Sequence, residues 1–258
     1  MRQTVRNQPV NPYYNSAFIT GKRILERRHL AGKMPALPAE DHLRKSVSAS
    51  TSFFLALRLF YRRLGIMLTA NVLWIVSSLP LVTLPAATGA LFYLAHRLVL
   101  EERQRDPHYA RTGDFWIGFR LYGWRSTWLF LLQLAAFAII AAVLRFYWTS
   151  PLELLRWLAG PVFLILIVWL GVQIYLFPLL IVFPEQSIPA IIRRAFIYVI
   201  TYPLYTLLLL VWMVLLTVIC LVLAGPVLLV LFALLALIQT VALRVLRVAH
   251  NEIEQPKS

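Results

Sequence analysis

Long apolar segments fill most of this chain beyond residue 64, and they restrict it to one class of fold. A bilayer core about 30 Å thick is crossed by about 20 apolar residues in a helix. Hydrophobic residues make up 60% of the 258 positions and charged residues only 14%, which excludes a water-soluble domain of this size. We therefore expect an all-α, polytopic transmembrane helix bundle with six spans, the second one short. The spans are expected at about residues 64–84, 86–100, 124–144, 158–183, 198–223 and 226–246.

The distribution of basic residues predicts the orientation of these spans. If the short stretch 86–100 crosses the membrane, all but two of the 25 Lys and Arg residues lie on one side, the exceptions being Arg145 and Arg156. If it does not cross, the basic residues divide much more evenly. Because an excess of Lys and Arg marks the cytoplasmic side, we expect six crossings of the membrane with both termini in the cytoplasm. The same clustering beside the spans accounts for the net charge of +14 without a nucleic-acid partner.

The chain divides into three parts by composition. Residues 1–50 form a basic tail without sustained periodicity, which we expect to be disordered in the cytoplasm. Residues 51–250 form the transmembrane domain, and residues 251–258 form a cytoplasmic C-terminal tail. Just before the first span, residues 53–64 combine apolar side chains with arginines at helical spacing, which is typical of a basic helix lying in the membrane interface. No cleavage-type site follows the first apolar run, so we expect the first span to be retained.

The beginning of the second span favours close helix packing. Pro85 suits a helix start, because its missing N–H falls where no intrahelical partner exists. Ala86, Gly89 and Ala90 form a small-residue face that another helix can approach closely. A tight hairpin between the first two spans is the favoured interpretation. The alternative is a broken helix pair that lines a binding cavity, as in many transporters.

The sequence contains no recognisable arrangement for catalysis or metal binding. The single cysteine, Cys220, lies in an apolar run, and the carboxylates beyond residue 64 fall in the joints between spans or in the C-terminal tail. The histidines lack the spacing of metal-ligand motifs such as HExxH: they are His29, His42, His96, His108 and His250. We therefore expect neither enzyme activity nor a cofactor nor a metal. The lack of a carboxylate inside the spans also counts against a proton-coupled transporter.

Some polar and aromatic residues do lie inside the expected spans. If a polar site exists, its first candidates are Asn71, Ser78, Thr83, Thr88, Gln173 and Gln239. Hydrogen bonding between helices is the simpler explanation for each of them. Four tryptophans have side chains that can stack on a sugar ring, although packing and interfacial anchoring are commoner roles: Trp74, Trp128, Trp169 and Trp212.

Several short motifs, in order and at similar spacing, resemble those of the YesL-like membrane proteins, a bacterial family of unknown function. The matching stretches are 71–74, 78–93, 114–120, 175–180 and 194–196, within a region of about 55–215. The chain departs from the family pattern at Leu84-Pro85, where a glycine is usual, and at Arg194, where an asparagine is usual. Relatives often occur beside carbohydrate-uptake transporter components. The resemblance therefore implies an accessory role in sugar import, with a transporter permease or another membrane subunit as partner.

Two functions from different classes remain open. The leading interpretation is a non-enzymatic accessory protein or scaffold for a membrane complex, with Ala86 and Ala90 as a docking face. The alternative is a stand-alone transporter or channel for a small neutral solute, which would use the helix break at Pro85 and polar residues at mid-depth. A lipid-active enzyme is a weaker third possibility, because no acid, base or nucleophile constellation is present.

Overall fold

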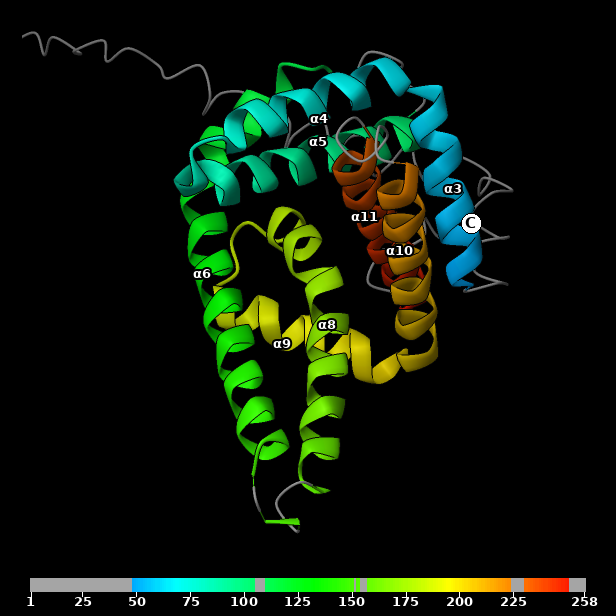
Figure 1. Ribbon diagram of the computed structural model, residues 1–258. Coiled ribbons are helices and arrows are strands. Elements are labelled where there is room, and N and C mark those ends of the chain that lie inside the picture. Colours follow the sequence, from blue (N-terminus) through cyan, green and yellow to red (C-terminus); the bar gives the residue numbers. More distant parts are fainter. Residues whose placement is uncertain (1–47, 105–109, 151, 154–156, 224–229, 251–258) are drawn as a thin grey trace, which may run out of the picture. The chain divides into compact units, whose positions relative to one another are not determined.

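The computed structural model describes residues 48–104, 110–150, 152–153, 157–223 and 230–250, and every regular element in these ranges is helical (Figure 1). The prediction of an all-α fold is confirmed. Contacts divide the chain into two units, one of which is Ser46–Arg247 and the other Met1–Lys45 with Val248–Ser258. All packing described below lies within the first unit. Residues 1–47 of the expected N-terminal tail and the expected tail 251–258 lie outside the described residues.

The helices follow one another with short connections. In chain order they are α3 (Ala49–Arg62), α4 (Leu64–Ser78), the 3-10 turn η1 (Leu81–Thr83), α5 (Leu84–Gln104), α6 (Asp114–Trp148), α8 (Ala159–Val182), α9 (Ile188–Thr201), α10 (Pro203–Leu223) and α11 (Phe232–Ala249). Neighbouring α4 and α5 run across one end of α6 and α10 in the view of Figure 1.

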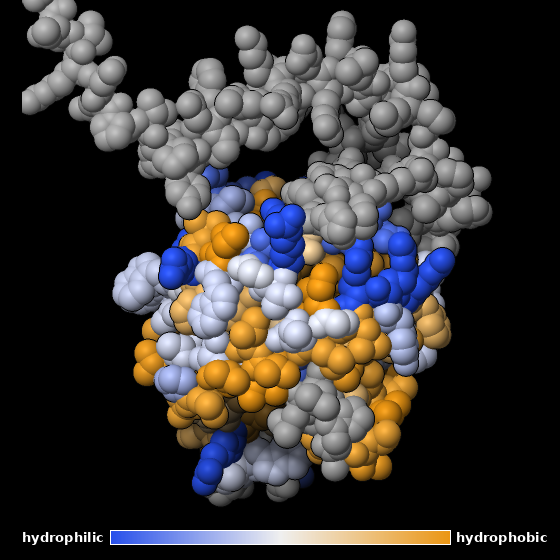
Figure 2. Space-filling model, turned by 90° about the horizontal axis from the view of Figure 1, so that it is seen from above, coloured by the Kyte–Doolittle hydropathy of each residue, from blue (hydrophilic) through white to orange (hydrophobic). Residues whose placement is uncertain are grey.

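Four of these helices are long and apolar enough to cross a membrane: α6, α8, α10 and α11. The pair α3 and α4 passes the same test when taken together, but the two helices meet at a bend of 94°. The described residues thus hold four or five candidate spans, compatible with a multi-pass membrane protein. On the face shown in Figure 2, hydrophobic side chains cover most of the described surface, and hydrophilic ones gather mainly towards one edge.

Two expected spans are interrupted where proline follows an apolar run. The stretch 64–84 contains α4, which ends at Ser78 before the Leu79-Pro80 break, and the turn η1. The stretch 198–223 is divided between α9 and α10, with Tyr202 between them and Pro203 opening the second helix. At the second break Tyr202, the residue before proline, has left the helical region, with φ −127° and ψ 59°. At the first break Leu79 is still helical, and the chain leaves the helix at Pro80, which has φ −75° and ψ 110° and lacks the N–H that the helix would need. In contrast, α8 continues through Pro178.

Helices α5 and α6 pack closely through small residues. A Cβ atom placed on Gly118 of α6 would lie 2.7 Å from Cβ of Tyr93 on α5, and one on Gly123 would lie 3.3 Å from Cβ of Ala86. Since residue 118 faces 93 and residue 123 faces 86, the two helices are antiparallel. The first two turns of α6, which precede the expected span 124–144, are stabilised by this contact with α5.

Burial separates the inner helices from the outer ones. In the most apolar window of α8 and of α11, 61% of the residues are buried inside the protein, against 11% for α6 and 17% for α10. Helix α3 packs on α10, where Ser52 and the Tyr205 hydroxyl lie 2.7 Å apart and the Phe53 ring stacks on Trp212 at 4.9 Å. The basic helix expected before the first span is therefore tied to another helix through its apolar face.

Candidate functional site

Asn71 joins two helices that are distant in the sequence. Its side chain is fully buried on α4, and its Oδ1 accepts a hydrogen bond of 3.0 Å from the backbone N–H of Ala233, in the first turn of α11. Val230 and Leu231, directly before α11, form part of a π-helical turn. Asn71 thus fixes the beginning of α11 to α4, which is a structural task.

Thr88 and Trp74 form a second contact beside Asn71. The indole N–H of Trp74 donates to the Thr88 hydroxyl at 3.2 Å, and this hydroxyl donates in turn to the carbonyl of Leu84 at 2.9 Å. The Trp74 ring also stacks on Phe232, with 4.1 Å between centroids. The structure therefore brings Asn71 and Thr88 together through Trp74 and the start of α11.

Thr83 closes the turn between α4 and α5. Its hydroxyl lies 2.5 Å from the carbonyl oxygen of Ser77 and 2.7 Å from that of Pro80, and its N–H donates to Pro80 at 2.8 Å. The side chains around it point outwards, because Leu79, Leu81 and Val82 are among the most exposed apolar residues described, at 76%, 80% and 84%. Thr83 thus provides hydrogen bonds to the carbonyl groups of the turn, while the exposed side chains of the turn are apolar.

The remaining candidates lie apart from this group. Ser78 Oγ is buried, and no hydrogen bond to it is found among the described residues. Gln173 is half-buried on α8 and Gln239 is half-buried on α11. Of the four tryptophans, Trp169 is buried, Trp74 and Trp212 stack on phenylalanines, and Trp128 is exposed.

The small-residue face of α5 is occupied from within the chain. Ala86, Gly89 and Ala90 are all buried. A Cβ atom on Gly89 would overlap the Ser126 hydroxyl of α6 and approach Cβ of Tyr122 to 3.7 Å. The close approach expected here takes place with α6, which leaves no room on this face for a partner protein.

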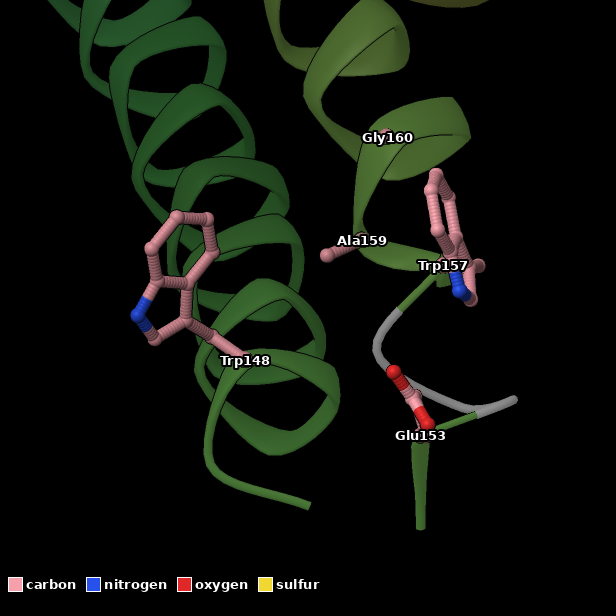
Figure 3. A pocket seen from close by; sticks show the side chains of 5 residues that line it. All are labelled: Trp148, Glu153, Trp157, Ala159 and Gly160. Carbon is pink, nitrogen blue, oxygen red and sulfur yellow. The ribbon is translucent and has the colours of Figure 1, made fainter. Parts of the chain in front are cut away.

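A pocket of about 370 Å³ lies where α6 connects to α8, a site that the sequence analysis did not identify (Figure 3). It is lined by Trp148, Glu153, Trp157, Ala159 and Gly160. Figure 3 shows Trp148 on α6 and Trp157 just before α8 on opposite sides, with Glu153 in the connection between the helices. The sequence feature that could have indicated this pocket is the pair Trp148 and Trp157 on either side of Glu153.

A second pocket, of about 400 Å³, shares Trp148 with the first and is lined mainly by apolar side chains. Its remaining lining residues are Phe137, Ala141, Leu144, Arg145, Thr149 and Leu166. Together the two pockets give this end of α6 and α8 an aromatic surface with one carboxylate and one guanidinium nearby. Such a surface suits contact with the amphipathic boundary of a bilayer or with a neutral ligand.

Ion pairs hold the end of α3 to α5, and α5 to α6. Arg62 donates to both oxygens of Glu102, at 2.6 and 2.8 Å, and Arg63 is paired with the buried Glu101. Asp114, at the start of α6, accepts from Arg97 at 3.2 Å. These three carboxylates therefore form ion pairs within the fold. Exposed pairs such as Arg62–Glu102 contribute little to the free energy of unfolding.

Comparison with known proteins gives a match to a family model. Residues 67–143 match a family model described as a protein of unknown function, DUF624. This supports a relationship to a DUF624 family over α4, α5 and most of α6, and the match contains the resembling motifs at 71–74, 78–93 and 114–120. The motifs at 175–180 and 194–196 lie beyond it. No curated protein and no solved structure matches the chain.

Proposed function

We propose that this chain is a non-enzymatic membrane protein that serves as an accessory subunit or scaffold for another membrane complex. The observation that supports this proposal is that polar residues inside the expected spans form hydrogen bonds within the fold. Asn71, Thr83 and Thr88 are engaged in hydrogen bonds that fix helices or a turn. A transporter of neutral solutes would need such groups at mid-depth for its substrate, whereas a scaffold needs a rigid fold with a free lateral surface.

The lateral surface of α6 is suited to contact with a partner helix. Only 11% of its apolar window is buried inside the protein. Ala135, Ala138 and Ala142 are exposed and fall on one side of the helix. Helices associate in membranes where small residues permit close approach. We place the partner's helix here, and the resemblance described above favours a sugar-transporter permease or a similar membrane subunit as the partner.

The test is purification of the full chain from native membranes in mild detergent, with quantitative mass spectrometry of co-eluting proteins. We expect one membrane subunit at near-unit ratio for the unaltered chain. Ala138→Leu combined with Ala142→Leu should reduce its recovery about tenfold by preventing close helix approach. Val143→Phe, at an exposed position on another side of α6, is the matched control and should retain the partner.

The outcome that contradicts the scaffold proposal is a partner-free protein, or equal loss of the partner in the control variant. The stand-alone transporter for a small neutral solute then becomes the stronger candidate, and the pocket at Trp148 and Trp157 is the feature that favours it. Solute flux into proteoliposomes of the purified chain would be the next measurement.

For the topology we propose both termini in the cytoplasm of a bacterial plasma membrane. The α4–η1–α5 hairpin returns to the side from which it starts, so it leaves the orientation of the later helices unchanged. After Cys220→Ala, a cysteine introduced at Thr149 should react with an impermeant maleimide from outside. A cysteine introduced at Ser187 should react only after permeabilisation. Labelling of both positions from the same side would overturn this orientation.

A further inference from the structure

The pocket of about 400 Å³ extends along α6 from the end of the helix towards its interior. The α6 residues that form its apolar wall recur at helical spacing and therefore share one side of the helix: they are Phe137, Ala141, Leu144 and Trp148. Leu166 of α8 also lines the pocket. From residue 137 to residue 148 the helix rises by about 16 Å, close to one leaflet of a hydrocarbon core about 30 Å thick. The pocket thus has the length of the acyl region of one leaflet.

Charged and aromatic side chains lie at the end of this apolar wall. Arg145, in the last turn of α6, lines the same pocket. The neighbouring pocket shares Trp148 and adds Glu153 and Trp157 (Figure 3). Among the residues that the structure describes, no ion pair joins Arg145 to Glu153. A guanidinium in one pocket and a carboxylate in the other therefore lie near a shared indole ring without forming an ion pair with each other.

We propose that the two pockets together bind one zwitterionic phospholipid, whose headgroup carries a phosphate and an ammonium group. The chemistry of the site follows the order of groups in such a lipid: apolar side chains for an acyl chain, then Arg145 for the phosphate, then Glu153 and the two tryptophans for the ammonium. A guanidinium binds phosphate oxygens through parallel hydrogen bonds. An indole ring attracts a cation to its face, and a carboxylate supplies the opposite charge. We call the residues that line both pockets the lipid site.

Anchoring at the membrane interface is a simpler role for exposed tryptophans, but it does not account for the whole arrangement. Anchoring requires neither a pocket that α6 and α8 line together nor a guanidinium and a carboxylate beside it. The apolar wall of the lipid site also lies on a different side of α6 from Ala135, Ala138 and Ala142, given 3.6 residues per turn. A lipid and a partner helix can therefore bind at the same time. The inference goes beyond the proposed scaffold function and does not rest on it.

The test is native mass spectrometry of the full-length protein in neutral detergent, titrated at low lipid ratio with two phospholipids of identical acyl chains. Phosphatidylethanolamine carries the ammonium group, whereas phosphatidylglycerol carries a glycerol in its place. Glu153→Gln should weaken phosphatidylethanolamine binding by about threefold, because the ammonium loses its opposite charge at an exposed position. Phosphatidylglycerol binding should not change.

Glu185→Gln is the matched control, because it removes an exposed carboxylate beyond the other end of α8. It should change the binding of either lipid by less than about 1.5-fold. Unchanged phosphatidylethanolamine binding in Glu153→Gln, equal loss of both lipids, or equal loss in the control would overturn the proposal.

Trp148→Leu tests the side chain that both pockets share. It should weaken phosphatidylethanolamine binding by about threefold or more, because an aromatic face for the ammonium is lost. Trp124→Leu is the comparison, since Trp124 is on the same helix and is 74% exposed, against 72% for Trp148. If Trp124→Leu weakens binding as much as Trp148→Leu does, the loss reflects general contact with detergent and lipid, and the lipid site is wrong.

A final measurement separates a lipid from a soluble ligand with the same headgroup. Glycerophosphoethanolamine has the phosphate and the ammonium but no acyl chains. Because the apolar wall of the lipid site contributes to binding only through an acyl chain, this compound should displace phosphatidylethanolamine at least about tenfold less effectively than an unlabelled lipid does. Equal displacement would show that the site takes a soluble zwitterion and would overturn the assignment to a lipid.

Discussion

Gly118→Ala is expected to destabilise the protein by about 1–3 kcal/mol, the usual penalty for overpacking a closely packed contact. The added methyl group would lie 2.7 Å from Cβ of Tyr93 and 2.9 Å from its Cδ1. A Cβ atom cannot rotate away, so relief requires α5 and α6 to move apart. The expected result is a lower midpoint of thermal unfolding in detergent, with early loss of the α5–α6 contact in hydrogen exchange.

Gly65→Ala is the matched control for this change. Gly65 is also helical, on α4, and nothing lies within 4 Å of a Cβ atom placed there. Alanine is favoured over glycine within a helix by about 1 kcal/mol, so the control should unfold at the same temperature or higher. Equal destabilisation by both substitutions would show that the close approach at Gly118 is not what determines stability.

Asn71→Leu is expected to destabilise the protein by about 1–3 kcal/mol, the range for a buried polar group left without a partner. Leucine cannot accept the hydrogen bond from Ala233, and water does not reach this fully buried position to replace it. The start of α11 should then exchange its amide hydrogens faster, while the protein still inserts in the membrane.

Thr69→Val provides the comparison for Asn71→Leu. The Thr69 hydroxyl is on the same helix, but it donates only to carbonyls of its own helix, Gly65 at 2.9 Å and Ile66 at 3.0 Å, and it is exposed. We expect an effect below about 0.5 kcal/mol at such a position. A stable Asn71→Leu protein that lost solute flux would contradict the structural role and favour the transporter.

Segment length and apolar content predicted the bounds of the buried helix α8 well. They did not predict the breaks at prolines or the early start of α6. The expected span 158–183 corresponds to α8, Ala159–Val182, because a continuous apolar run has only one way to satisfy its backbone in a membrane. The breaks at Pro80 and Pro203 have a local signal, the proline itself, which is lost when hydropathy is averaged over a whole apolar segment. The early start of α6 at Asp114 had no such signal, since it depends on cover supplied by α5.

For the candidate site, the sequence predicted the type of contact that a residue makes but not the residue or helix that it contacts. Small residues at Ala86 and Gly89 indicated close helix approach, but the pattern does not identify α6 as the partner. Asn71 was expected to hydrogen-bond between helices, yet its partner is 162 residues away in the sequence, and no local pattern links the two. The pocket at Trp148 and Trp157 was not predicted, because the sequence alone does not distinguish tryptophans that anchor a helix at the membrane interface from tryptophans that line a pocket.

The hydrogen bond from Ala233 to Asn71 also bears on the order of assembly. During synthesis α4 leaves the ribosome long before α11, so this hydrogen bond can form only after the chain has grown by the 162 positions that separate Asn71 from Ala233. Contacts of such long sequence separation form late and slowly. The nascent protein must therefore spend this interval without the hydrogen bond that joins α4 to α11, and the contact is completed only when α11 arrives.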